Sequence, residues 1–147
     1  MNPSERKHAR HYALQAMYQW QLSQTALADI ETEFLKHQIN KKIDLDYFKE
    51  LLHQIPNHHA ALDQRIMPHL QRSFADIDPI ELAILRIGTY ELTHRPDIPY
   101  RVAINEALEL TKKFASVESY KFVNSVLDQI AHQIRTTEIS SEGKNAK

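Results

Sequence analysis

Five side chains that can hold a positive charge stand close together near the start of the chain. They are Arg6, Lys7, His8, Arg10 and His11. Arg6 and Arg10 are four residues apart and Lys7 lies three before Arg10, so on a helix these side chains share one face. Their place near a helix N-terminus opposes the helix dipole, which disfavours cations there. The cluster predicts an anion-binding surface, with an ordinary solvated helix face as the alternative. Replacing Arg6 and Arg10 is expected to leave stability nearly unaltered.

The composition makes this positive charge a local feature. The chain has 147 residues and a formal net charge of −1, so it is not expected to coat nucleic acid non-specifically. It contains no cysteine, which excludes a disulfide framework and a thiolate nucleophile. Neither a secretory signal nor a run of about 18 apolar residues is present. We expect a cytoplasmic protein without a membrane segment.

Motifs for metal or cofactor chemistry are missing. The nine histidines form no HExxH pattern, and the two glycines cannot build a glycine-rich phosphate loop. The acidic pair Glu106 and Glu109 lies near Lys112 and Lys113, which favours surface ion pairs over an acid–base couple. We therefore expect no metal, no cofactor and no enzymatic activity.

Few glycines and a helical spacing of apolar residues predict an all-α protein. Helices are expected over about 4–23, 26–38, 59–72 with a break at Pro68, 80–92 and 99–114. A further helix is expected from Asp44 or Asp46 to Ile55, and a last one from Ser116 or Ser119 to Ile134. Asp78 and Pro79 form a strong start signal for the fifth helix, which is apolar on nearly every side and therefore central. Residues 1–135 are expected to form one helical domain. The tail 136–147 has little to bury and is expected to be disordered.

Other cations stand in segments that also contain aromatic residues. The cations are Arg72, Arg86, Lys112, Lys113 and Lys121, and the aromatic residues are Tyr90, Tyr100, Phe114, Tyr120 and Phe122. Cations beside exposed rings suit single-stranded RNA, whereas core packing is the alternative and is favoured for Tyr90 and Phe122. Arg86 is the only charge between Ile84 and Gly88. It must either pair with an internal carboxylate or emerge at a functional surface.

Four segments together resemble the NusB family of bacterial transcription antitermination factors. They are RKHARHYALQAMYQWQLS, ILRIGTYEL, IPYRVAINEALELTKKFA and SYKFVNSVLDQIA, and the likeness covers about residues 3–135. It implies a compact bundle of about seven helices in two packed subdomains of three to four helices. It also implies an RNA-binding protein that joins NusE, the ribosomal protein S10, on the boxA element of ribosomal RNA leader transcripts. That complex enters an RNA polymerase antitermination assembly and promotes complete transcription of rRNA operons.

The resemblance also assigns roles to positions of this sequence. RNA contacts are expected at Arg6, Lys7, His8, Arg10, Arg72, Arg86, Lys112, Phe114 and Lys121. Partner contacts are expected at Glu81, Tyr100, Glu118 and Phe122. Lysine and histidine interrupt the family's arginine run, which predicts weaker RNA binding or a pH dependence through His8. Ser125 stands where many relatives have glycine, a change that a helix tolerates.

Two other functions share this pattern. One is the NusB-like domain at the front of some ribosomal RNA cytosine methyltransferases, which the chain length disfavours. The other is a helical adaptor that binds only protein. The free protein is expected as either a monomer or a homodimer that hides the RNA face.

Overall fold

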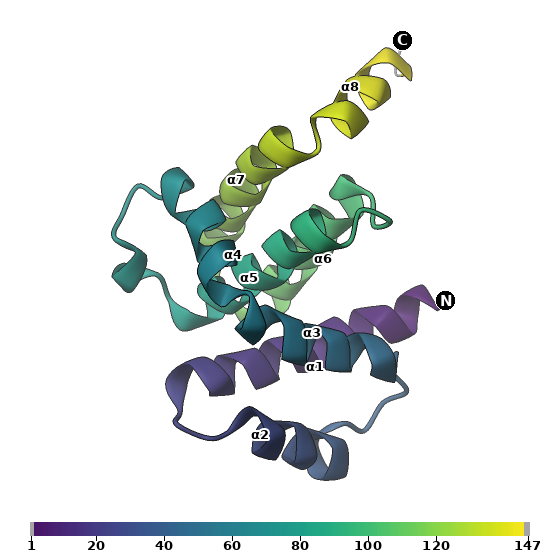
Figure 1. Cartoon of the computed structure of the whole chain (residues 1–147), viewed down its shortest axis with the longest axis vertical. Coiled ribbons are helices and arrows are strands. Elements are labelled where there is room, and N and C mark those ends of the chain that lie inside the picture. Colours follow the sequence, from purple (N-terminus) through teal and green to yellow (C-terminus); the bar gives the residue numbers. More distant parts are fainter. Residues whose placement is uncertain (1, 146–147) are drawn as a thin grey trace.

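The computed structural model describes residues 2–145, and over that range the regular structure is helical (Figure 1). The α-helices are α1 (Pro3–Leu22), α2 (Leu27–Glu33), α3 (Leu45–Asn57), α4 (His59–Ile66), α5 (Pro79–His94), α6 (Tyr100–Phe114), α7 (Val117–Ile134) and α8 (Thr136–Asn145). A π-helical turn, Phe34–Gln38, extends α2, and 3-10 turns lie at Met67–His69 and Phe74–Asp76. The prediction of an all-α bundle is confirmed, with one helix more than the seven expected.

Helix α5 organises the bundle. It contacts α1, α3 and α4, which precede it in the sequence, and α6 and α7, which follow it. Figure 1 shows α1 and α3 side by side with α2 beneath them, while α5, α6 and α7 pack together above. Nearly every residue of α5 from Glu81 to Leu92 is buried, as its apolar sequence predicts.

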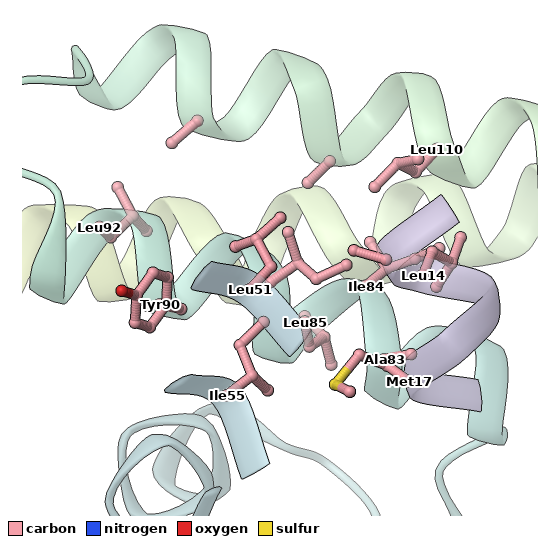
Figure 2. Close-up of a cluster of buried hydrophobic side chains, with 14 of the residues drawn as sticks. Leu14, Met17, Leu51, Ile55, Ala83, Ile84, Leu85, Tyr90, Leu92 and Leu110 are labelled. Carbon is pink, nitrogen blue, oxygen red and sulfur yellow. The ribbon is translucent and has the colours of Figure 1, made fainter. Parts of the chain in front are cut away.

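One hydrophobic core runs through both halves of the chain. Met17 of α1, Leu51 and Ile55 of α3 and Leu85 of α5 meet in it, and all four side chains are buried (Figure 2). The helix that bears the basic cluster is therefore fixed to the body of the protein by its opposite face.

Capping contacts confirm the predicted start of α5 and decide between the two candidate caps of α3 and of α7. The Asp78 Oδ1 atom accepts the main-chain N–H of Ile80 at 2.8 Å, with Pro79 in the first helical position. Asp44 caps α3 by accepting the N–H of Tyr47 at 3.0 Å, and Ser116 caps α7. These polar side chains satisfy N–H groups that the first turn of a helix leaves unpaired.

The fourth expected helix is shorter than the prediction of 59–72. Helix α4 ends at Ile66, and residues Met67–His69 form a 3-10 turn. Pro68 has no main-chain N–H and disfavours a helical conformation at the residue before it, so the regular helix stops there.

The tail prediction is wrong for residues 136–145, which form α8 instead of a disordered segment; residues 146–147 lie outside the described residues. The buried Arg135 anchors the turn into α8 by donating to the Leu92 carbonyl at 2.9 Å and to Glu138 at 2.6 Å. Glu138 also accepts the main-chain N–H of Tyr100 at 2.8 Å. Since α6 has no side-chain cap of its own, α8 supplies one from 38 residues away.

Candidate nucleic-acid interface

The exposed face of the first half of α1 is cationic. Ala9, Ala13 and Met17 are buried, so helical periodicity turns Lys7, which is 41% exposed, toward solvent. His8 and His11 are partly exposed beside it. Asn2 begins the helix by accepting the main-chain N–H groups of Ser4 and Glu5.

Two other segments bring cations to the same face. The Lys113 ammonium at the end of α6 lies 3.2 Å from His11 Nδ1, and the Phe114 ring meets the His11 ring edge-on at 5.8 Å. His8 Nδ1 lies 3.4 Å from the main-chain oxygen of Lys42, in the connection between the α2 segment and α3. We define the basic platform by the following residues: Lys7, His8, His11, Lys41, Lys42, Lys113 and Phe114.

The connection that contains Lys41 and Lys42 is held in place by a tyrosine of α1. The Tyr12 hydroxyl donates to Asn40 Oδ1 at 2.8 Å. The Lys41 charge acts directly on His11, together with the charges of Lys7 and Lys113. Three separate segments thus contribute positive charge to one surface, which is the arrangement that phosphate binding requires.

Arg10 is not on this platform, contrary to its predicted contact with RNA phosphate. Its side chain is 3% exposed, and its Nε atom donates to the Glu91 carboxylate of α5 at 2.7 Å. The buried Tyr47 hydroxyl donates to the same carboxylate. Burial raises the pKa of Glu91, and Arg10 and Tyr47 oppose that rise. Arg10 therefore joins α1 to α5 inside the protein instead of facing solvent.

Arg6 is neither exposed, like most lysines of the basic platform, nor buried, like Arg10. Its guanidinium carbon sits 4.4 Å from the centre of the Tyr47 ring, while Arg10 and Arg95 sit 5.5 and 5.1 Å from it. Arg6 is partly exposed and its Nε atom has no hydrogen-bond partner among the described residues. It also lines a pocket of about 190 Å³ beside Asp97. The Arg6 Nε atom is itself buried and offers no donor to solvent, although the side chain as a whole is partly exposed, whereas Arg10 is buried.

Arg86 takes the first of the two alternatives that the sequence left open. It is buried on α5, and its Nε and Nη2 atoms donate to the two oxygens of Asp63 at 2.9 and 2.8 Å. The Nη1 atom of Arg86 donates to Gln21 Oε1 of α1 at 3.0 Å. This paired geometry satisfies the guanidinium inside the protein, so Arg86 is not presented to solvent as the predicted RNA contact would require.

Arg72, in the connection between the two 3-10 turns, and Phe122 of α7 form a second surface. The Arg72 guanidinium lies 4.3 Å from the centre of the Phe122 ring and donates to Glu81 at 3.2 Å. Arg72 and Phe122 line a pocket of about 410 Å³, and the exposed Lys121 lines it as well. Glu81 is buried and also accepts the Ser119 hydroxyl at 2.6 Å. Its role here is to hold Arg72 over the ring, which leaves little of the carboxylate for the predicted partner contact.

A shallow apolar groove adjoins the basic platform. It has a volume of about 470 Å³, and Leu22 at the end of α1 is 57% exposed beside it. Its lining comprises Leu14, Gln15, Tyr18, Gln19, Leu22, Ser23, Phe34, Gln38, Ile80 and Phe114. Phe114 belongs to both the groove and the platform, so the two surfaces share an edge.

The described residues contain no group of three or more histidine, cysteine or acidic side chains placed to hold a metal ion. Within the same range, no helix is long and apolar enough to cross a membrane.

A model of the NusB family matches residues 7–132. The chain belongs to the NusB family. It is 55% identical over 130 residues to the transcription antitermination protein NusB of Shewanella loihica, covering 88% of this chain and 97% of that relative. The NusB of Idiomarina loihiensis is 49% identical over 137 residues, covering 93% and 99%. The NusB of Shewanella denitrificans is also 49% identical, over 133 residues, covering 90% and 100%.

The remaining positions expected from the NusB resemblance are divided between interior and surface. Tyr100 is 6% exposed, and its hydroxyl donates to Glu142 of α8 at 3.2 Å, so this side chain contacts α8 within the chain. Glu118 is exposed on the first turn of α7. Lys112 is exposed and lies 5.6 Å from the centre of the Tyr120 ring, next to a pocket of about 350 Å³ that includes Val117.

The sequence reasoning missed part of the surface of this NusB-family chain. Lys41 and Lys42 lie in a polar connection that local patterns do not link to α1. His11 and Lys113 were identified as cationic residues but were not among the RNA contacts that the resemblance implied. The signal for Arg10 was present, because Arg10, Ala13, Leu14 and Met17 share the i, i+3, i+4, i+7 spacing of one buried stripe.

Proposed function

We propose that this chain is a non-enzymatic, RNA-binding transcription antitermination factor. It binds the boxA element of ribosomal RNA leader transcripts together with NusE, the ribosomal protein S10. Membership of the NusB family supports this role, and so does the similarity to bacterial transcription antitermination proteins. The observation that carries the RNA-binding part is the basic platform, where cations from α1, α6 and the connection before α3 act on His11, whose ring meets Phe114 edge-on.

The platform suits single-stranded RNA in two ways. Its lysines lie on a surface where they can replace the counterions of a phosphate backbone. The partly exposed Phe114 ring offers a flat apolar partner for an unstacked base. The chain as a whole has a net charge of −1, so specificity for RNA depends on this one surface.

We place the NusE contact in the apolar groove beside the platform. Leu22 is too exposed for a residue that serves only the core, and Phe114 borders both surfaces. A protein seated in the groove would therefore lie next to bound RNA, and the two could extend one continuous binding surface. A second copy of this chain is the alternative occupant in the RNA-free state.

A salt titration tests the RNA-binding proposal. Affinity for a fluorescein-labelled boxA RNA is measured between 50 and 200 mM salt (roughly a fourfold range), with a scrambled RNA as control. Replacing Lys41 and Lys113 together by alanine should flatten the slope of log K against log salt by about 1.4, the value for two single-strand phosphate contacts. Arg65→Ala, an exposed cation of α4 outside the platform, should leave the slope unchanged. An adaptor that binds only protein would give no RNA binding at any salt concentration.

The groove is tested with Leu22→Glu. This variant should lose the gain in boxA affinity that NusE provides, while its own affinity for RNA stays the same. Leu45→Glu, at an exposed leucine of α3 that does not line the groove, is the matched control. Equal loss in both variants would contradict the placement of NusE, and a change in dimer content by sedimentation would assign the groove to self-association.

A further inference from the structure

His11 occupies an electrostatic position unlike that of an ordinary surface histidine. It lies at the centre of the basic platform, where Lys113 and Phe114 of α6 contact its ring. Its own helix adds Lys7 and His8, whose ring centre is 6.3 Å away, and the connection before α3 adds Lys41. The charged and titratable groups that act on His11 are therefore three lysines and one histidine.

The contact with Lys113 requires a neutral imidazole. A lysine ammonium has three donors and no acceptor, so at 3.2 Å His11 Nδ1 must offer its lone pair. A protonated ring would point an N–H at the ammonium and place two positive charges side by side. Burial and the surrounding cations lower the pKa of His11 to about 4, in agreement with this geometry.

A phosphate group that enters the platform would oppose the effect of the cations, which together with burial keep His11 neutral. Its negative charge would pair with Lys113, Lys7 or Lys41 and would favour the charged form of any imidazole within a few ångströms. The Lys113 ammonium could then turn to phosphate oxygen and leave His11 Nδ1 free to bind a proton. His11 would become a second donor to the same anion.

We propose that His11 is an RNA-contacting residue that takes up a proton when RNA binds to the platform, so that RNA binding tightens as the pH falls. This inference rests on the proposed RNA-binding function. The sequence-based expectation placed a pH dependence at His8 instead. His8 contacts the main-chain oxygen of Lys42 and, among the described residues, has no lysine ammonium in hydrogen-bond contact with its ring.

The first test compares the pH dependence of boxA affinity in three proteins. Anisotropy with labelled boxA RNA is recorded at pH 7.5, 6.5 and 5.5 and constant ionic strength (values chosen around the ordinary histidine pKa of about 6.5). If bound His11 returns to that ordinary pKa, the wild type should bind about tenfold more tightly at pH 5.5 than at pH 7.5. His11→Gln should lose most of this gain, and His8→Gln should keep it.

The possible outcomes distinguish failure of the His11 proposal from failure of the proposed RNA-binding function. Failure to bind boxA RNA at any pH and at low salt would overturn both. RNA binding that is independent of pH, or a pH dependence that disappears in His8→Gln and persists in His11→Gln, would overturn the role of His11 alone. The wild-type protein provides a second measurement that does not depend on a variant folding. The His11 ring signal in NMR should titrate at a higher pH with boxA RNA bound than in the free protein, and an unchanged midpoint would refute the proposal.

Discussion

Replacing Arg10 should destabilise the protein, although it lies in the basic cluster that the sequence suggests is a binding surface. The Arg10 Nε atom donates to Glu91 at 2.7 Å, and both side chains are buried. Arg10→Ala leaves the Glu91 carboxylate with the Tyr47 hydroxyl as its hydrogen-bond donor. It also opens a cavity between α1 and α5.

Removal of one partner from a buried ion pair costs about 3–5 kcal/mol, because the other charge is left without compensation. For a chain of this length that loss lowers Tm by roughly 10 °C or more. Lys7→Ala is the matched control. The Lys7 ammonium lies 3.7 Å from Glu106 in a pair exposed to solvent, and such pairs contribute about 0–1 kcal/mol.

Urea unfolding followed by far-UV circular dichroism at pH 7 measures both variants. Burial already raises the pKa of Glu91, and loss of Arg10 raises it further, so the folded variant should bind a proton more readily than the unfolded chain. The stability of Arg10→Ala, relative to wild type, should therefore improve as the pH is lowered. Addition of Glu91→Gln to Arg10→Ala should recover part of the loss, because it removes the unpaired charge.

The reasoning would be refuted if Arg10→Ala unfolded within 1 kcal/mol of the wild type, or if its deficit were independent of pH. Either result would mean that Glu91 is not held as a buried anion. The first result would also restore the expectation that Arg10 can be removed without a change in stability.

The other predictions concern packing, capping and titration. Gly88→Val should destabilise the protein by about 1–3 kcal/mol in urea unfolding, because even a Cβ atom at Gly88 would lie 2.7 Å from Leu127 Cδ1; an unchanged midpoint would show that the helices can separate freely. Glu138→Ala should cost about 1 kcal/mol by removing the cap of α6, and hydrogen exchange should rise in the first turn of that helix. The lowered pKa of His11 means that the folded state binds fewer protons than the unfolded chain, so stability should fall as the pH drops from about 6.5 toward 4. His11→Gln should reduce that fall, and an identical pH profile would exclude His11 as its source.

Local signals explain why much of the fold could be predicted from the sequence. The start of α5 depends on neighbouring residues, since Asp78 caps the helix and Pro79 fits its first position. The burial of α5 follows from apolar residues on nearly all of its faces. Pro68 marked the interruption after α4, although the sequence did not show that the helix would fail to resume.

The parts of the site that could not be predicted depend on distant partners. Whether Arg10 faces RNA or the interior is decided by Glu91, 81 residues later. Arg86 likewise depends on Asp63, 23 residues earlier, and both outcomes were compatible with its local sequence. The helix at residues 136–145 forms because Arg135 and Glu138 bind groups of α5 and α6, which a local measure of hydrophobicity does not register.

The platform has a consequence for how the protein is made. His11 and Lys113 are 102 positions apart, so a ribosome has produced most of the chain before the two can meet. Until α5 follows, α1 emerges with Arg10 unpaired and with no fixed relation to the later lysines. A nascent chain that stops before α6 therefore lacks the assembled surface, and any RNA that it attracts meets a lone cationic helix.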